Sequence, residues 1–214
     1  HFRKEIQRLR EETDGCFFYI WQPEHIDEAE CWPLDPDQNW HGFANADTDH
    51  MYLDPIKVTI LTPGMNEMGK LEEEGIPAAL VAKFLDERGV VVEKTGPYNL
   101  LFLFSIGIDK TKSMSLMRGL TDFKRSYDLN LRIKNMLPDL YAENPDFYRN
   151  MLIQGLAQRI HKLIVRHDLP RLMLEAFDVL PEMKMTPYEM FQHQVRGQVD
   201  ECDIDELVGK VSAN

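Results

Sequence analysis

The 214-residue chain is poor in cysteine, lacks long uncharged apolar runs and has fewer basic residues than acidic ones. Its cysteines are odd in number, far apart and form no C-x-x-C pair, which argues against a disulfide framework or a zinc site and fits a reducing cytoplasm. No stretch reaches the roughly 18 apolar residues of a membrane helix, so no membrane partner is expected. With 24 Lys+Arg against 36 Asp+Glu, the net charge of −12 would repel a phosphate backbone and disfavours nucleic acid as a partner. The cysteines are Cys16, Cys31 and Cys202.

Complete catalytic motifs are missing as well. The segment Gly107–Lys112 (GIDKTK) lacks the second glycine that a phosphate-binding loop places directly before its lysine. His161 and His167 are six residues apart, roughly 120° around a helix, so they are poorly placed to share a metal and are predicted to be surface or capping histidines. No Ser/His/Asp or Cys/His set is legible, and no signal peptide is expected.

Hydrophobic spacing predicts helices and short strands separated by turn residues. The expected helices cover residues 2–12, 78–88, 110–135, 146–167, 170–180 and 187–195. The expected strands cover residues 16–21, 57–62, 90–93 and 100–105. The acidic, tryptophan-bearing stretch between Trp21 and His50 is expected to be irregular.

This order of elements predicts an α+β fold: a short, mostly antiparallel sheet with flanking helices, then a mainly helical part. The two parts are expected to be residues 1–131 and 132–214, with the boundary between Asn130 and Pro138. Because the chain starts at His1 rather than Met and ends without a polar tail, it is expected to be a piece of a larger protein.

Three arginines, Arg118, Arg125 and Arg132, recur at seven-residue intervals in the expected helix 110–135. This spacing would keep them within about 40° of one helical face, where guanidinium groups could bind phosphates or carboxylates. Alternatively, Asp122 and Asp128 lie four residues from Arg118 and Arg132 and could pair with them locally.

Glu93 ends an expected apolar strand, beside Lys94 and the turn residues Thr95–Pro97. A carboxylate at a strand end is well placed to meet a cationic ligand. The plainer alternative is a solvated pair of charges, Glu93 and Lys94, at the strand end.

Several long strings carry a specific resemblance: WHGF (40–43), LDPIKVTILTPGM (53–65), GIPAALVAKFLDERGVVVEKTGPYNLLFLFSIGIDKTK (75–112) and FKRSYDLNLRIKNMLPDLY (123–141). The chain resembles the bacterial fold-type-I ornithine/lysine/arginine decarboxylases over essentially its whole length, and the lysine decarboxylases most. The resemblance implies a small aminotransferase-like subdomain in residues 1–131, followed by part of the C-terminal domain of a longer enzyme.

The resemblance also implies pyridoxal 5′-phosphate chemistry that converts L-lysine to cadaverine and CO₂, within a cytoplasmic response to acid stress. The family's cofactor lysine follows a Ser-x-His sequence, whereas the His161-Lys162 pair follows Arg159-Ile160. Lys162 is therefore not expected to hold the cofactor, which the full-length enzyme would bind through a lysine outside these residues. The fragment should contain no catalytic residue and be inactive alone. The alternatives are an arginine or ornithine decarboxylase fragment, or a non-catalytic assembly or alarmone-binding module.

Two sets of residues match functional positions of the family. Glu93, in VVVEKTGPYN, corresponds to a carboxylate that approaches the distal amine of the substrate. Arg125, Leu131, Arg132 and Asn135 resemble positions at which lysine decarboxylases bind the inhibitor guanosine tetraphosphate. The implied partners are the rest of the decarboxylase chain and further copies of it, as homodimers that assemble into decamers.

Overall fold

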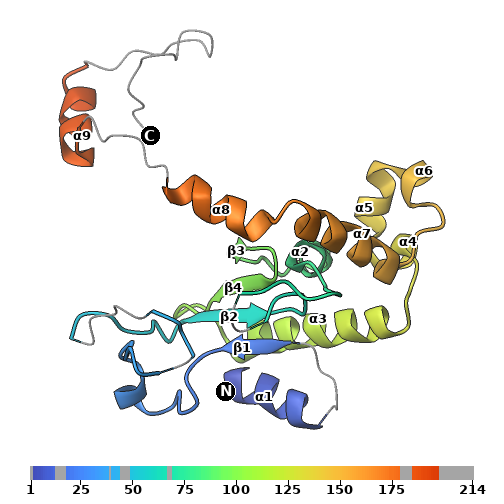
Figure 1. Cartoon of the computed structure of the whole chain (residues 1–214), viewed down its shortest axis with the longest axis horizontal. Coiled ribbons are helices and arrows are strands. Elements are labelled where there is room, and N and C mark those ends of the chain that lie inside the picture. Colours follow the sequence, from blue (N-terminus) through green and yellow to red (C-terminus); the bar gives the residue numbers. More distant parts are fainter. Residues whose placement is uncertain are drawn as a thin grey trace. The chain divides into compact units, whose positions relative to one another are not determined.

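The structure is a computed structural model, and it divides into two compact units, His1–Pro170 and Arg171–Asn214, which are described separately. It describes residues 2–12, 18–38, 40–43, 49–66, 69–178 and 185–197. The first unit has an α+β fold, as predicted, in which helices pack against a small antiparallel sheet (Figure 1).

The sheet has the strand order β1-β2-β4-β3, and every neighbouring pair is antiparallel. Central strands β2 and β4 pair over five residues with Ile60 opposite Leu100, and Ile60 also faces Ile20 of β1. The bounds are β1 Tyr19–Trp21, β2 Lys57–Leu61, β3 Lys94–Thr95 and β4 Asn99–Leu103.

Alternation of apolar residues explains why one face of this sheet is covered. Val58 and Ile60 of β2 are buried, and so are Leu100 and Phe102 of β4, whereas the residues between them are more exposed. Because side chains alternate between the faces of a strand, these four residues point to the same side and form part of the hydrophobic core.

Three helices, α1, α2 and α3, supply much of the rest of this core. In α1, Phe2 and Ile6 are buried four residues apart, and the Phe2 ring lies 4.8 Å from the Phe104 ring just after β4. On α3, Phe123 is fully buried, and its ring centroid lies 5.3 Å from that of Phe84 on α2. The bounds are α1 Phe2–Glu12, α2 Ala78–Asp86 and α3 Lys110–Asp128.

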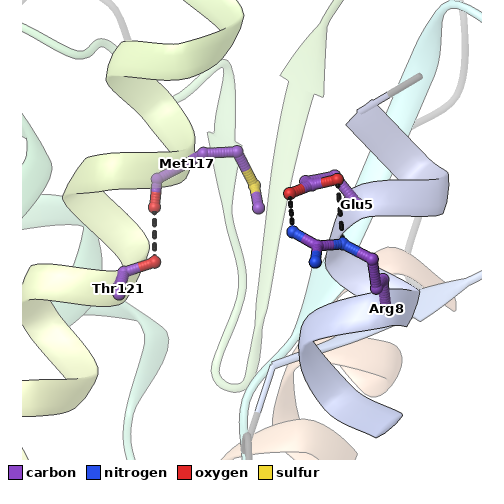
Figure 2. Close-up of polar contacts among 4 residues, drawn as sticks. All are labelled: Glu5, Arg8, Met117 and Thr121. Carbon is purple, nitrogen blue, oxygen red and sulfur yellow. Dashed lines mark hydrogen bonds and ion pairs between the residues drawn. The ribbon is translucent and has the colours of Figure 1, made fainter. Parts of the chain in front are cut away.

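The contact between α1 and α3 is visible in Figure 2, where the Met117 side chain points from α3 toward α1. There Glu5 and Arg8 form a two-bond ion pair within α1, while the Thr121 hydroxyl donates to the Met117 carbonyl oxygen at 2.9 Å. A cavity of about 350 Å³ lies between these two helices.

Further helices follow α3 in the first unit: α4 Ile133–Met136, α5 Pro138–Glu143, α6 Pro145–Tyr148 and α7 Ile153–Arg166. Helix α8, Leu169–Asp178, begins at the end of the first unit. In the second unit, α9 (Pro187–Val195) begins with a reciprocal cap, since the Thr186 amide donates to the Glu189 carboxylate at 2.7 Å and the Glu189 amide donates to the Thr186 hydroxyl.

The long helix expected over residues 110–135 is wrong, because the chain leaves α3 at Asp128. Asn130 adopts a left-handed conformation with φ 48°, and the Leu131 amide donates back to the Ser126 carbonyl oxygen. Asparagine tolerates this conformation better than most residues, so it ends the helix where a glycine would be the usual signal. A new turn, α4, then starts after Arg132.

Two other expectations need correction. Residues 90–93 are not a strand: the Val90 amide donates to the Leu85 carbonyl oxygen, so it closes the end of α2 after Gly89 (φ 74°) rather than joining the sheet. The helix expected over 146–167 is interrupted between α6 and α7. There the Ile133 amide donates a hydrogen bond to the Met151 carbonyl oxygen, and the Ile153 amide donates one to the Leu131 carbonyl oxygen.

The other expected elements agree with the structure in the described residues. Helix 187–195 has the predicted bounds. The expected strand 57–62 ends one residue after β2, and the expected strand 100–105 begins one residue after β4 begins and ends two residues after β4 ends. Residues 16 and 17 of the expected first strand lie outside the described residues, as do Cys16 and Cys202, and Cys31 is a free thiol. The predicted domain boundary at 131/132 stays a prediction.

Candidate functional site

Four predicted site residues, Arg125, Leu131, Arg132 and Asn135, lie around the junction of α3 and α4, and we call this group the arginine corner. Arg125 stands in the last turn of α3, directly before Ser126, whose carbonyl oxygen accepts from the Leu131 amide. Arg132 is the residue before α4, and its carbonyl oxygen accepts from the Asn135 amide at 3.0 Å. The backbone therefore brings all four residues to one corner, although they lie on separate elements.

The backbone of this corner is held on both sides. The Ile153 amide donates a hydrogen bond to the Leu131 carbonyl oxygen at 2.9 Å, and the Ile133 amide donates one to the Met151 carbonyl oxygen at 3.0 Å. Ile133 is fully buried, while Arg132 and Asn135 on either side of it are exposed. The buried Ile133 therefore holds the backbone from which the exposed side chains of Arg132 and Asn135 project.

Charge pairing differs among the three arginines that are seven residues apart. Arg118 lies 3.7 Å from Asp122 in an exposed ion pair, as the local alternative predicted, whereas Asp128 pairs with Lys124 rather than Arg132. Among the residues that the structure describes, neither Arg125 nor Arg132 has an ion-pair partner. The seven-residue spacing itself does not place the three on one helical face, since the helix ends between Arg125 and Arg132.

Glu93 lies apart from the arginine corner, at the start of the hairpin formed by β3 and β4. We call residues 93–103 the Glu93 hairpin. The Glu93 amide donates to the Leu101 carbonyl oxygen at 2.9 Å, and its side chain is exposed with no ion-pair partner within the described part of the chain. A fixed backbone and an unpaired carboxylate are compatible with binding a cationic group.

The histidine prediction is wrong for His161 and right for His167. His167 is exposed at the end of α7, but His161 is only 1% exposed and forms a 2.7 Å hydrogen bond with the hydroxyl of Tyr98. Lys162, the next residue, is exposed on α7. No group of three potential metal ligands occurs among the described residues.

The GIDKTK segment forms a helix start rather than a phosphate loop. The Asp109 carboxylate accepts from the Lys112 amide at 2.9 Å and caps α3, while the Lys112 ammonium donates to the Gly107 carbonyl oxygen at 2.8 Å. This lysine is therefore used to close its own loop. Within the described ranges, no helix is both long and apolar enough to cross a bilayer.

Two family models match the chain and define its class. The model "Orn/Lys/Arg decarboxylase, major domain" matches residues 1–112, and "Orn/Lys/Arg decarboxylase, C-terminal domain" matches residues 170–214. Together with the α+β fold, these matches show that the chain belongs to the Orn/Lys/Arg decarboxylase family.

Individual relatives are similar over the whole chain. It is 75% identical over 214 residues to the constitutive lysine decarboxylase of Escherichia coli K12, and 67% identical over 213 residues to the lysine decarboxylase of Hafnia alvei. The solved structure of the E. coli constitutive enzyme superimposes with a TM-score of 0.81 at 75% identity and covers all of the chain. The chain spans only about 30% of the length of these relatives.

Sequence reasoning overlooked the buried pair of Tyr98 and His161. A signal was available for His161, because Ile153, Leu156, Ala157 and Ile164 stand at helical spacing with it and are all buried. A histidine in such an apolar stripe is expected to be buried with hydrogen-bond partners. Its partner Tyr98 is 63 residues away in the sequence, and no local pattern links the two.

Proposed function

We propose that the 214 residues are the C-terminal portion of a cytoplasmic, pyridoxal 5′-phosphate-dependent decarboxylase that converts L-lysine to cadaverine and CO₂ in the response to acid stress. The observation that carries the proposal is the 75% identity to a constitutive lysine decarboxylase, which extends over every part of the chain. The chain covers 30% of that relative, so the remainder of the parent protein supplies the rest of the active site.

The described residues do not fit the cofactor. The only His-Lys pair in the sequence is His161-Lys162, and His161 is buried with Tyr98 while the Lys162 side chain is exposed on the surface of α7. An exposed amine on a helix has no enclosed pocket in which to hold a cofactor. The cofactor lysine therefore belongs to the parent protein outside these residues, and no chemical step is assigned to this chain.

Glu93 is the residue of this chain that we assign to substrate binding. In the parent its carboxylate would accept charge-assisted hydrogen bonds from the distal ammonium of lysine, which needs a partner when it leaves water. The exposed, unpaired carboxylate and the backbone bond to Leu101 support this role.

The arginine corner would bind a regulatory anion, guanosine tetraphosphate, as an inhibitor. Support comes from Arg125 and Arg132, whose guanidinium groups have no carboxylate partner among the described residues, and from Asn135, which is exposed beside them. Guanidinium groups bind phosphates through two parallel hydrogen bonds and suit a ligand with several phosphates. Further basic residues would come from other parts of the assembly, a homodimer that builds decamers.

The test of the proposed activity is a steady-state assay of the full-length parent with lysine, arginine and ornithine. We expect kcat/KM for lysine to exceed that for ornithine, which is one methylene shorter, by at least about tenfold. Preference for arginine or ornithine would keep the family but reject lysine as the substrate. Absence of decarboxylation with all three would favour a non-catalytic assembly or alarmone-binding module.

The test of Glu93 uses Glu93→Gln, which removes the charge and keeps the size of the side chain. We expect KM for lysine to rise about tenfold or more, since a charge-assisted bond is replaced by a neutral one. Glu73→Gln, at another exposed glutamate outside the hairpin, is the matched control and should leave KM unchanged. Equal KM values for Glu93→Gln and the parent would remove Glu93 from the site.

A further inference from the structure

Tyr98 and His161 form a buried polar contact between the Glu93 hairpin and α7. Tyr98 is 2% exposed and His161 is 1% exposed, and the tyrosine hydroxyl lies 2.7 Å from Nδ1 of the histidine. Their rings meet edge to face with centroids 5.8 Å apart. Two polar groups thus leave water together, which is favourable only when their hydrogen bonds are satisfied.

The hydrogen bonds of the pair are complete and directional. The Glu72 carbonyl oxygen lies 3.2 Å from Nε2 of His161 and can only accept, so Nε2 carries a proton and donates to it. In the tautomer that is protonated at Nε2, Nδ1 accepts from the Tyr98 hydroxyl, whose pKa burial raises to about 12. His161 therefore links the hairpin to the loop that contains Glu72.

The surrounding backbone leaves room for both rings. A Cβ at Gly64 would lie 2.2 Å from Cε1 of Tyr98, and a Cβ at Gly75 would lie 2.4 Å from Nδ1 of His161. Gly64 also has φ 132°, which other residues rarely adopt. The two glycines allow the loop to pass directly against the pair.

Tyr98 also connects to the rest of the fold through the backbone of its turn. Its carbonyl oxygen accepts from the Thr62 amide at 2.9 Å, and the preceding Pro97 carbonyl accepts from the first amide of α2, at Ala78. In contrast, β3 pairs with β4 over only two residues, both exposed. The buried tyrosine is therefore the side chain through which this turn is held in the core.

We propose that Tyr98 and His161 are positioning residues for Glu93: by tying the hairpin to α7 they set where the Glu93 carboxylate stands. This inference deepens the proposed function and rests on Glu93 binding the distal ammonium of the substrate. Tyr98 and His161 themselves touch no substrate. Loosening the hairpin would displace the Glu93 carboxylate and weaken its hydrogen bonds to the substrate ammonium. The effect on substrate binding should therefore be larger than the effect on the chemical step.

A double-mutant cycle in the full-length parent tests this role, with Tyr98→Phe, Glu93→Gln and the combination. Tyr98→Phe keeps the ring and removes only the hydroxyl. We expect it to raise KM for lysine about 3- to 10-fold, the range for losing one buried hydrogen bond, while kcat changes less than about twofold. Adding Tyr98→Phe to Glu93→Gln should raise KM no further, because Tyr98 acts through the carboxylate that is already lost.

Tyr141→Phe is the matched control, since Tyr141 is a partly buried tyrosine on α5, packed against the same core. It should leave KM unchanged. Hydrogen exchange supplies a readout independent of activity: amides of residues 93–103 should exchange faster in Tyr98→Phe than in the parent or in Tyr141→Phe.

The outcomes separate this inference from the proposed function. If Glu93→Gln raises KM and Tyr98→Phe does not, Glu93 binds substrate but the pair does not position it. If the two KM effects multiply in the double variant, Tyr98 acts by another route and the inference is overturned. If lysine is not decarboxylated by the parent at all, the proposed function fails, and faster exchange confined to the hairpin would then show only that the pair holds it.

Discussion

The Tyr98–His161 pair and the arginine corner are two polar regions of the same compact unit with opposite arrangements. In the pair, each ring nitrogen and the tyrosine hydroxyl has a partner and both side chains are buried. At the corner, the backbone is held by Met151 and Ile153, but the two arginine side chains have no ion-pair partner among the described residues. The difference is that the buried polar groups of the pair satisfy one another and hold two elements together, whereas the exposed guanidinium groups of the corner have no carboxylate partner in the described part of the chain.

The largest expected effect comes from crowding the pair. Gly64→Ala would place a methyl group within 2.2 Å of the Tyr98 ring at φ 132°. Steric clash and backbone strain together should destabilise the fold by about 3–5 kcal/mol. The measurement is the unfolding midpoint of the full-length protein, together with hydrogen exchange of residues 62–76.

The matched control for this change is Gly155→Ala. Gly155 is exposed on α7, and no atom lies within 4 Å of the added Cβ. Because alanine favours helix over glycine, we expect stabilisation of about 0.5–1 kcal/mol. Equal behaviour of the two variants would contradict the tight packing of Gly64 against Tyr98.

A smaller effect, on binding and not on folding, is expected at the arginine corner. Arg132→Ala should weaken binding of guanosine tetraphosphate to the full-length protein by about 10- to 100-fold, the range for charged hydrogen bonds. The free energy of unfolding of the Arg132→Ala variant should differ from that of the parent by less than about 0.5 kcal/mol, because the Arg132 side chain is exposed. Isothermal titration and thermal unfolding measure the two quantities.

Arg118→Ala is the control for this prediction, since Arg118 is exposed and pairs with Asp122 at 3.7 Å. It lies on α3, seven residues before Arg125 and outside the corner. Because its guanidinium group is already paired with Asp122, its loss should leave the affinity within about twofold of the parent. Equal losses in both variants would show that general positive charge, rather than the corner, attracts the ligand.

The smallest expected effect is a pH dependence of the pair. Burial raises the pKa of Tyr98 from 10 to about 12, so its stabilising contribution is fully present below pH 10 and is lost as pH rises toward 12. The stability difference between the parent and Tyr98→Phe should therefore narrow over that interval. Denaturation curves at several pH values measure it, and a constant difference would contradict a protonated, buried hydroxyl.

Much of the sheet could be predicted from the sequence, because alternation in β2 and β4 and the apolar stripe of α3 are local patterns. The break at Asn130 could not, since helical propensity continues through it and no glycine or proline marks it. That break also removed the spacing argument for the three arginines. The four residues of the arginine corner were chosen through family resemblance, and their binding role stays a prediction; the structure shows that they lie around one helix junction.

Long-range contacts explain the remaining misses. Tyr98 and His161 are 63 residues apart, and their bond depends on the way α7 returns to the turn before β4. Val90 begins an apolar segment that is typical of a strand, yet its amide donates to the Leu85 carbonyl oxygen at the end of α2. In both cases tertiary structure decides the partner of a polar group, which local spacing does not encode.

The central claim is that this chain positions substrate and regulator while the cofactor is held elsewhere in the parent protein. Borohydride reduction of the full-length holoenzyme, followed by proteolysis and mass spectrometry, attaches the cofactor permanently to the lysine that holds it. The account predicts a single labelled lysine outside the 214 residues. A label on any lysine within them, and on Lys162 above all, would contradict it.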